Sequence, residues 1–246
     1  MRRYPSPYAS SFSFGPGPVS TVLKALIGAN VAMFFLQLMP AVTDILGLRP
    51  IFVVQNLWVW QLVTYMFLHG SPIHILFNML ALWMFGGELE RVWGVRFFLK
   101  YYFVTGIGAG VLTVLFSLLP FEFSRGIYES NIIGASGAIF GLLLAFGLYF
   151  PDRLILLVIF PVQAKFAVLI MGAIAFYLSL SGASGGVANA THLGGLLVGY
   201  VYLKGTRARP LAELKYRYVK WKMNRVRKKF DVYSGGRSND WDRRVH

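Results

Sequence analysis

The sequence predicts an all-α membrane protein, a bundle of six transmembrane helices. Hydrophobic residues make up 56% of the 246 residues and charged residues only 14%, whereas about a quarter of the residues in a soluble domain are charged. The apolar residues fall in long runs separated by short polar stretches, which is typical of one helical bundle that crosses a bilayer. Cysteine is absent, which excludes disulfides, thiolate catalysis and cysteine-based metal sites.

The predicted spans follow from these apolar runs. Pro40, Pro120 and Pro151 end the first, third and fourth runs, because proline cannot continue a helix. The fourth and sixth runs are near or below the roughly 17–25 residues that usually cross a bilayer. The apolar segment 154–161 either extends a neighbouring span or lies along the membrane interface. We expect spans at residues 19–39, 71–89, 97–119, 134–150, 163–180 and 189–203.

The membrane domain, residues 20–204, is flanked by two segments of different composition. Residues 1–19 are rich in Ser, Pro and Gly without an apolar period, which predicts a disordered cytoplasmic tail. Residues 205–246 are predicted to be a basic cytoplasmic tail, partly helical. Within the domain, segment 41–61 is half apolar and contains two tryptophans, so we expect it to lie in the outer membrane interface against the bundle.

The basic residues predict the orientation of the chain. Residues 204–246 hold 14 of the 24 Lys and Arg residues but 4 of the 10 acids, so most of the net charge of +14 is local to this tail. The side opposite the N-terminus carries only Arg49 and Arg125. Because basic loops stay inside, we expect an integral protein of the bacterial inner (plasma) membrane with both termini in the cytoplasm. Segment 210–230 either binds anionic lipids of the inner leaflet or is a solvated tail, and nucleic-acid binding is disfavoured because no folded domain is predicted there.

Four polar residues share one depth in this topology. The second, fourth and sixth spans all run from outside to inside, and His74, Asn78, Ser136 and His192 lie near their starts. With a rise of about 1.5 Å per residue, these side chains lie within roughly the outer third of the bilayer. Polar side chains inside a membrane are costly and tend to face one another or a wet cavity. We therefore expect the three spans to form one polar site.

These side chains predict nucleophilic catalysis. Ser136 opens a helix, where backbone N–H groups and the helix dipole favour negative charge, and His192 is a base that could take the serine proton. His74 and Asn78 are spaced i, i+4 on one helix face, from which they could donate hydrogen bonds to an oxyanion; His69 lies at the entrance of that span. No Asp or Glu lies at this depth, so the catalytic unit would be a Ser–His dyad.

Glycines would allow the serine and the histidine to approach each other. Small residues spaced four apart let two membrane helices pack closely. The fourth and sixth spans each carry such a pair beside the polar residue. These spans are therefore predicted to pack against each other through Gly137 and Gly141 on one side and Gly195 and Gly199 on the other.

The motifs together resemble those of the rhomboid family of intramembrane serine proteases. The resemblance covers about residues 20–204, and its specificity comes from the combination of motifs. The chain contains Gly134-x-Ser136-Gly137, His192-x-x-Gly195-x-x-x-Gly199 and His69-x4-His74-Ile75-Leu76-Phe77-Asn78, the last followed by Gly86-Gly87 and Glu90-x3-Gly94.

The resemblance implies a six-helix rhomboid-like core with a water-filled cavity open to the outside. In it Ser136 would be the nucleophile and His192 the general base. His74, Asn78 and the Ser136 backbone N–H would form the oxyanion hole, and His69 would hold water near the cavity.

Further expectations also come from the resemblance. Gly134 would allow the tight approach to the serine. The substrates would be single-span membrane proteins, cut near their outer end after a small residue, and no metal or cofactor is implied. Many members carry Trp-Arg near the end of the first loop, whereas this chain has Trp60-Gln61. This departure concerns the anchoring of the loop rather than the chemistry.

Other interpretations stand beside this one. The stretch Gly182-Ala183-Ser184-Gly185 repeats the letters around Ser136, but we interpret Ser184 as a loop residue with no apolar helix directly after it. A membrane transporter, or a non-catalytic membrane scaffold or chaperone, could use the same polar cavity. A transporter would predict a chain of acids or bases and repeat symmetry, and neither is evident. The histidines could bind a metal, although no zinc-type spacing such as H-E-x-x-H is present.

Overall fold

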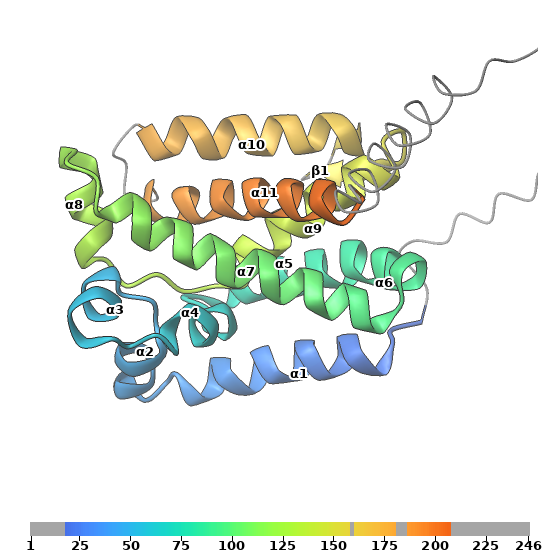
Figure 1. Cartoon of the computed structure of the whole chain (residues 1–246). Helices are drawn as coiled ribbons and strands as arrows, with labels where there is room; N and C mark the ends of the chain where they lie inside the picture. The colour runs from blue at the N-terminus through green and yellow to red at the C-terminus, as the bar shows by residue number, and fades with distance from the viewer. Residues whose placement is uncertain (1–17, 158–159, 181–185, 208–246) are drawn as a thin grey trace, which may run out of the picture. The chain divides into compact units, whose positions relative to one another are not determined.

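The computed structural model describes residues 18–157, 160–180 and 186–207, and these are mostly α-helical (Figure 1). By its internal contacts the chain divides into two units, Met1–Lys204 and Gly205–His246. The longer helical segments are α1 (Thr21–Leu36), α5 (Pro72–Ala81), the π-helical turn η2 (Leu82–Gly86), α6 (Gly87–Trp93), α7 (Val95–Ser117), α9 (Ser136–Tyr149), α10 (Ala164–Leu180) and α11 (Gly186–Arg207).

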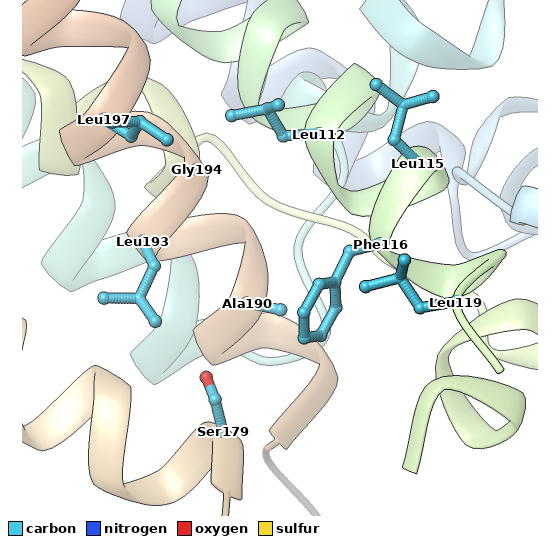
Figure 2. A pocket seen from close by; sticks show the side chains of 9 residues that line it. All are labelled: Leu112, Leu115, Phe116, Leu119, Ser179, Ala190, Leu193, Gly194 and Leu197. Carbon is cyan, nitrogen blue, oxygen red and sulfur yellow. The ribbon is translucent and has the colours of Figure 1, made fainter. Parts of the chain in front are cut away.

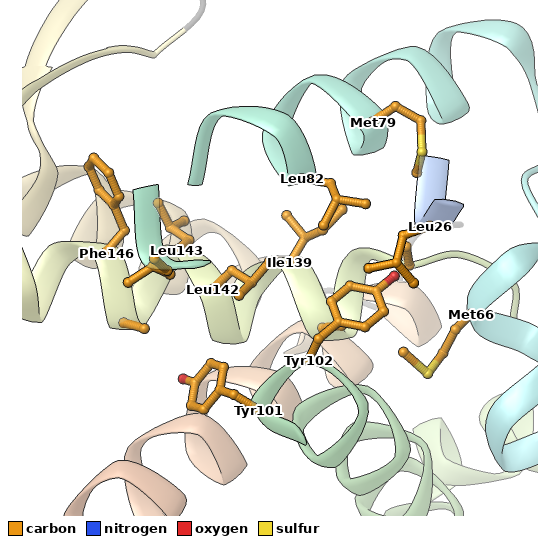
Figure 3. Packing of buried hydrophobic residues seen from close by; sticks show 14 of the residues in the cluster. Leu26, Met66, Met79, Leu82, Tyr101, Tyr102, Ile139, Leu142, Leu143 and Phe146 are labelled. Carbon is orange, nitrogen blue, oxygen red and sulfur yellow. The ribbon is translucent and has the colours of Figure 1, made fainter. Parts of the chain in front are cut away.

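Helix α9 lies at the centre of the first unit. It contacts α5, η2, α7 and α10, and most of its residues are buried. A helix that is apolar on all sides lies in a protein core or within a membrane, and neighbouring helices cover most of α9. Figure 3 shows how this is done: Ile139 and Leu142 of α9 pack among Leu82 of η2 and Tyr101 and Tyr102 of α7. The helix that begins with Ser136 is therefore held rigidly by the core.

The starts of α1 and α5 are set by serine caps. The Ser20 side chain accepts the Leu23 N–H, and the Ser71 side chain accepts the His74 N–H, each at 3.1 Å. Serine is among the preferred N-cap residues because its oxygen satisfies an N–H that has no partner within the helix. The cap of α5 has a consequence for the site, since it fixes the backbone of His74.

Not every predicted span keeps its predicted bounds. The second continues through η2 and α6 to Trp93, across two glutamates and an arginine. The sixth was expected to be short, but α11 begins at Gly186 and has 22 residues; a sequence rich in Gly, Ser and Asn misled the prediction. Ser184 itself lies outside the described residues, and the expectation that no helix follows it directly is wrong.

Length and composition support membrane crossing for part of these helices. Among the described residues, Pro72–Trp93 and Val95–Ser117 are long and apolar enough to span a bilayer. Helices α1, α9 and α10 are apolar but shorter, with 16, 14 and 17 residues.

Two segments without an assigned structure in the sequence prediction prove to be ordered. Segment 41–61 holds α2 (Pro40–Leu46) and α3 (Pro50–Asn56) and leads into α4 (Gln61–Thr64) and the 3₁₀-helix η1 (Tyr65–Phe67). Together with α8 (Glu122–Glu129), α2 and α3 lie at one end of the unit, and α6 and β1 lie at the other (Figure 1).

The apolar segment 154–161 extends neither neighbouring span. It forms most of an antiparallel hairpin of β1 (Leu154–Leu157) and β2 (Phe160–Gln163), with Leu154 opposite Gln163 and Leu157 opposite Phe160. Ile155 is buried, whereas Leu154 and Leu156 are exposed. This alternation is the period of a strand with one buried face.

Candidate functional site

The extended segment 130–135 leads from α8 into α9, and two other parts of the chain hold it. Leu48 and Ile132 exchange backbone hydrogen bonds of 2.9 and 2.8 Å, and the Gly134 N–H donates to the Tyr65 carbonyl at 2.9 Å. The segment between α1 and α5 therefore fixes the path of the chain into Ser136.

Gly134 occupies a position that only glycine fits. Its φ is +130°, a region that side-chain-bearing residues rarely adopt. A Cβ atom there would lie 3.0 Å from Nε2 of His74 and 3.5 Å from Oγ of Ser136. The imidazole and the hydroxyl thus both lie beside this glycine.

Ser136 and His192 are in hydrogen-bond contact across two helices. Ser136 is the first residue of α9, His192 lies on α11, and Oγ and Nε2 are 2.8 Å apart. The His192 ring stacks on Phe140, with centroids 4.2 Å apart and planes 5° apart. Its Nδ1 is buried and has no hydrogen-bond partner among the described residues. The ring is therefore oriented by the serine and by Phe140.

The backbones of α9 and α11 touch where glycine meets glycine. A Cβ atom on Gly195 would overlap the Gly137 carbonyl, and one on Gly199 would lie 3.3 Å from the Gly141 Cα. Each pair is separated from the next by about one helical turn. Contact of backbone with backbone at this crossing brings the histidine of one helix to the serine of the other.

His74 and Asn78 lie on α5 and are held by local hydrogen bonds. The Ser71 hydroxyl accepts the His74 N–H, and the Gly70 N–H donates to His74 Nδ1 at 3.3 Å. The Asn78 side-chain amide donates to the His74 carbonyl at 2.8 Å, which leaves its second N–H for another acceptor. The rings of His69 and His74 meet edge to face with centroids 5.1 Å apart.

His69 is fully buried, and neither of its ring nitrogens has a hydrogen-bond partner among the described residues. Buried polar groups nearly always have a partner, and ordered water is a common one. The side chain is thus chemically suited to hold a water molecule beside His74.

Two contacts at the site escaped the sequence analysis. Phe140 stands four residues after Ser136 and therefore shares its helix face, so the spacing could have suggested a contact with His192. Thr113 of α7 and Thr191 of α11 share a buried hydrogen bond of 2.9 Å. A pair of threonines 78 residues apart leaves no local signal in a sequence.

An apolar groove with a volume of about 380 Å³ lies elsewhere on α11. Ser179 of α10 lies at one end of it (Figure 2) and donates its hydroxyl proton to the Ala175 carbonyl. Neither Ser136 nor His192 lines the groove. Its other lining residues are Leu112, Leu115, Phe116, Leu119, Ala190, Leu193, Gly194 and Leu197.

Residues 56–209, more than half of the chain, match the family model of the Rhomboid domain. The chain belongs to the rhomboid family. This match confirms the family predicted from the motifs. A rhomboid domain also indicates that the chain is an integral membrane protein. The matched residues include Ser136 and His192.

Several relatives are about a third identical to this rhomboid over the residues that align. It is 33% identical over 187 residues to "Rhomboid protein 1, mitochondrial" of Saccharomyces cerevisiae, and the aligned region covers 74% of this chain and 52% of the relative. It is 32% identical over 148 residues to the rhomboid protease GluP of Bacillus subtilis, covering 60% and 26%. For the rhomboid protease GlpG of Yersinia pestis the match is 32% over 145 residues, covering 59% and 47%. The chain thus spans about half or less of the length of these relatives.

Proposed function

We propose that this rhomboid is an intramembrane serine endopeptidase in which Ser136 and His192 form a catalytic dyad. The observation that carries the proposal is the 2.8 Å contact between Ser136 Oγ and His192 Nε2. A serine hydroxyl becomes an effective nucleophile when a base within hydrogen-bond reach takes its proton. Two relatives are rhomboid proteases by name, which supports the same activity here.

The reaction begins when Ser136 Oγ attacks the carbonyl carbon of a substrate peptide bond and His192 Nε2 takes the hydroxyl proton. The tetrahedral intermediate then collapses, His192 gives this proton to the leaving amine, and an acyl ester remains on Ser136. Water attacks the ester while the same nitrogen takes its proton. The second tetrahedral intermediate breaks its bond to Ser136 Oγ, His192 returns the proton to this oxygen, and the new carboxyl terminus leaves. No carboxylate orients Nδ1 among the described residues, so the hydrogen bond to Ser136 and the stacking on Phe140 are the contacts that keep the ring in place.

Groups beside Ser136 are suited to stabilise the oxyanion. The first N–H groups of α9 have no partner within the helix, and the helix dipole favours negative charge there. Nε2 of His74 lies beside Gly134, as Ser136 Oγ does, and Asn78 lies one turn further along α5. One preorganised donor of this kind is worth about 10²–10³ in rate. His69 would hold water for the hydrolytic step.

The membrane arrangement is part of the proposal. Six segments would cross the bilayer: α1, the segment from α5 to α6, α7, α9, α10 and α11. Both termini would lie in the cytoplasm, and the end of the first unit that carries β1 and α6 would face the cytoplasm. Arg153 and Glu88 form an ion pair of 3.2 Å at that end, where basic residues are expected to stay inside. Ser136, at the start of α9, would then face the outer side.

Substrates and partners follow from this orientation. The substrates would be single-span membrane proteins, cut near the outer face of the bilayer of a bacterial inner membrane. The basic segment 205–246 would interact with anionic lipids of the inner leaflet, where each Lys or Arg is worth about 1 kcal/mol near the surface.

Labelling of the detergent-solubilised protein with a fluorophosphonate serine probe tests the dyad. The wild type and Ser184→Ala should label, Ser136→Ala should not, and His192→Ala should label far more slowly. Labelling that survives Ser136→Ala would overturn the assignment. A wild type that does not label, together with solute flux that persists in Ser136→Ala, would favour a transporter, and neither activity would favour a scaffold.

A further inference from the structure

Gln37, at the C-terminal end of α1, makes two hydrogen bonds to one residue of the loop before α5. Its side-chain oxygen accepts the His69 N–H at 2.8 Å, and its side-chain NH₂ donates to the His69 carbonyl. The residues around it, Leu36, Leu38 and Met39, are exposed and apolar. Gln37 itself is half-buried, and a buried amide is costly unless its donor and acceptor are both satisfied. Both ends of this amide are bound to the His69 backbone.

The bond to the His69 carbonyl also sets the direction of the next N–H. A trans peptide unit is planar, and its C=O and N–H point in opposite directions. The carbonyl of His69 and the N–H of Gly70 belong to one such unit. When Gln37 holds the carbonyl, the Gly70 N–H points the other way, where it donates to Nδ1 of His74 at 3.3 Å.

This hydrogen bond decides where the proton of the His74 ring lies. A neutral imidazole has one N–H and one acceptor nitrogen. Nδ1 accepts from Gly70, so the proton is on Nε2, the nitrogen beside Gly134. The backbone of His74 cannot easily turn away, because the Ser71 hydroxyl caps its N–H. Nε2 is therefore held as a donor near Ser136.

We propose that Gln37 is a positioning residue for His74: through the His69–Gly70 peptide it selects the Nε2–H tautomer and aims it at the site. Its effect on catalysis rests on the proposed protease function, whereas its effect on the tautomer does not. Gln37 comes from α1, a helix that contributes no other group to the site described above. This chain of hydrogen bonds thus connects α1 to His74, one of the proposed oxyanion donors.

The tautomer can be measured by ¹⁵N NMR of the imidazole nitrogens in the detergent-solubilised protein. The chain has four histidines, and the His74 signals are assigned by their loss in His74→Gln. In the wild type we expect Nε2 protonated and Nδ1 as acceptor. In Gln37→Met, which has similar volume but no donor or acceptor, the His74 signals should move to a mixture of the two tautomers. Gln55→Met, the same change at an exposed glutamine of α3, should leave them unchanged.

Kinetics on a single-span substrate then test the catalytic consequence. Gln37→Met should lower kcat by at least about tenfold, less than the full loss of an oxyanion donor, with KM little changed. Gln37→Glu is the conservative variant, because a protonated carboxyl both accepts and donates. Relative to the wild type at each pH, its tautomer signature and kcat should recover as the pH falls and the carboxyl gains its proton. This variant also provides the test if Gln37→Met does not fold.

An unchanged His74 tautomer in Gln37→Met, or in Gln37→Glu at high pH, would overturn the proposal whatever the activity. Lower thermal stability with unchanged tautomer and kcat would make Gln37 an anchor of α1 only. A wild type without Ser136-dependent probe labelling would refute the protease function instead, and the NMR result would still decide the role of Gln37.

Discussion

Gly134 shows how strongly a single residue constrains the site. We expect Gly134→Ala to abolish probe labelling of Ser136, because a methyl group would meet the His74 ring at 3.0 Å from a backbone with φ of +130°. Such backbone strain costs about 1–3 kcal/mol, so the protein should still fold. Labelling rate and melting temperature in detergent measure the two effects.

Gly28→Ala is the matched control for this prediction. A Cβ atom at Gly28, in the interior of α1, would have nothing within 4 Å. Alanine stabilises a helix interior by roughly 0.5–1 kcal/mol relative to glycine, so stability should be equal or higher and labelling unchanged. Normal labelling of Gly134→Ala would show that the close packing of His74 against this glycine is not required.

Phe140 gives a second prediction at the residue scale. Its ring lies parallel to that of His192, and an aromatic contact of this kind is worth about 0.5–1.5 kcal/mol. If the contact orients the base for proton transfer, Phe140→Leu should lower kcat by roughly 2- to 12-fold with little change in KM. Phe140→Tyr keeps the ring and should retain most of the rate. Phe35→Leu, at an exposed position of α1, is the control, and an equal fall in both variants would remove the special role of Phe140.

At the scale of helices, the crossing of α9 and α11 is the contact that assembles the dyad. Gly195→Ala should separate the two helices, since its methyl group would overlap the Gly137 carbonyl, which is backbone and cannot rotate away. Gly199→Ala should be milder, because its nearest neighbour is the hydroxyl of Tyr101 at 2.5 Å, the far end of a side chain. Gly205→Ala, with nothing within 4 Å, should be silent.

Melting temperature and probe labelling should both follow that order, with Gly195→Ala lowest. In Gly195→Ala the labelling rate should fall by more than the loss of stability alone would cause, because a small displacement of His192 from Ser136 prevents the proton transfer. Wild-type labelling in Gly195→Ala would contradict the idea that backbone contact at this crossing positions the histidine.

The parts of the site that could be predicted from sequence are those written in short motifs. Local spacing identifies Ser136, His192 and the glycines in the sequence, and the match to the Rhomboid domain supports the family to which these motifs belong. Gln37 and Phe140 are different, because each acts through a contact with a residue at least 32 positions away. A glutamine at the end of a helix has no distinctive pattern. The i, i+4 spacing of Phe140 from Ser136 indicates a shared helix face, which is a weaker signal than a motif.

The same distinction applies to the secondary-structure elements. Prolines and long apolar runs located the main helices, because these signals are local. The β1–β2 hairpin was not predicted, because its apolar run is too short to decide between strand and helix by periodicity. Pro161 within β2 also argues against a strand. Segment 41–61 was expected to lie in the interface, but nothing local predicted that Leu48 would pair with Ile132.

For the whole molecule, the two ends of the first unit carry different chemistry. At one end lie α2, α3 and α8, and the segment that leads into Ser136 starts from α8 (Figure 1). At the other end ion pairs join Glu88 to Arg153 and Asp152 to Lys165. Exposed ion pairs contribute about 0–1 kcal/mol each, and the end with α2 carries one as well, between Arg49 and Asp44. The difference between the ends therefore lies in the basic residues, with Arg91, Arg153 and Lys165 at the end with α6. Basic residues at one end are what sets the orientation of a membrane protein.

This asymmetry predicts which end faces the cytoplasm, and two glycines with open surroundings can test it. Gly126 in α8 and Gly205 after the last predicted span would each accept a side chain with nothing within 4 Å, and the chain has no cysteine of its own. In intact cells, Gly126→Cys should react with a membrane-impermeant maleimide, whereas Gly205→Cys should react only after permeabilisation. Ser124, close to Gly126, is buried and would report poorly. The reverse pattern would invert the orientation. Reaction of both variants from outside would require an even number of crossings between these positions. The six-span arrangement would then be wrong, because it places three crossings before Gly126 and three between Gly126 and Gly205.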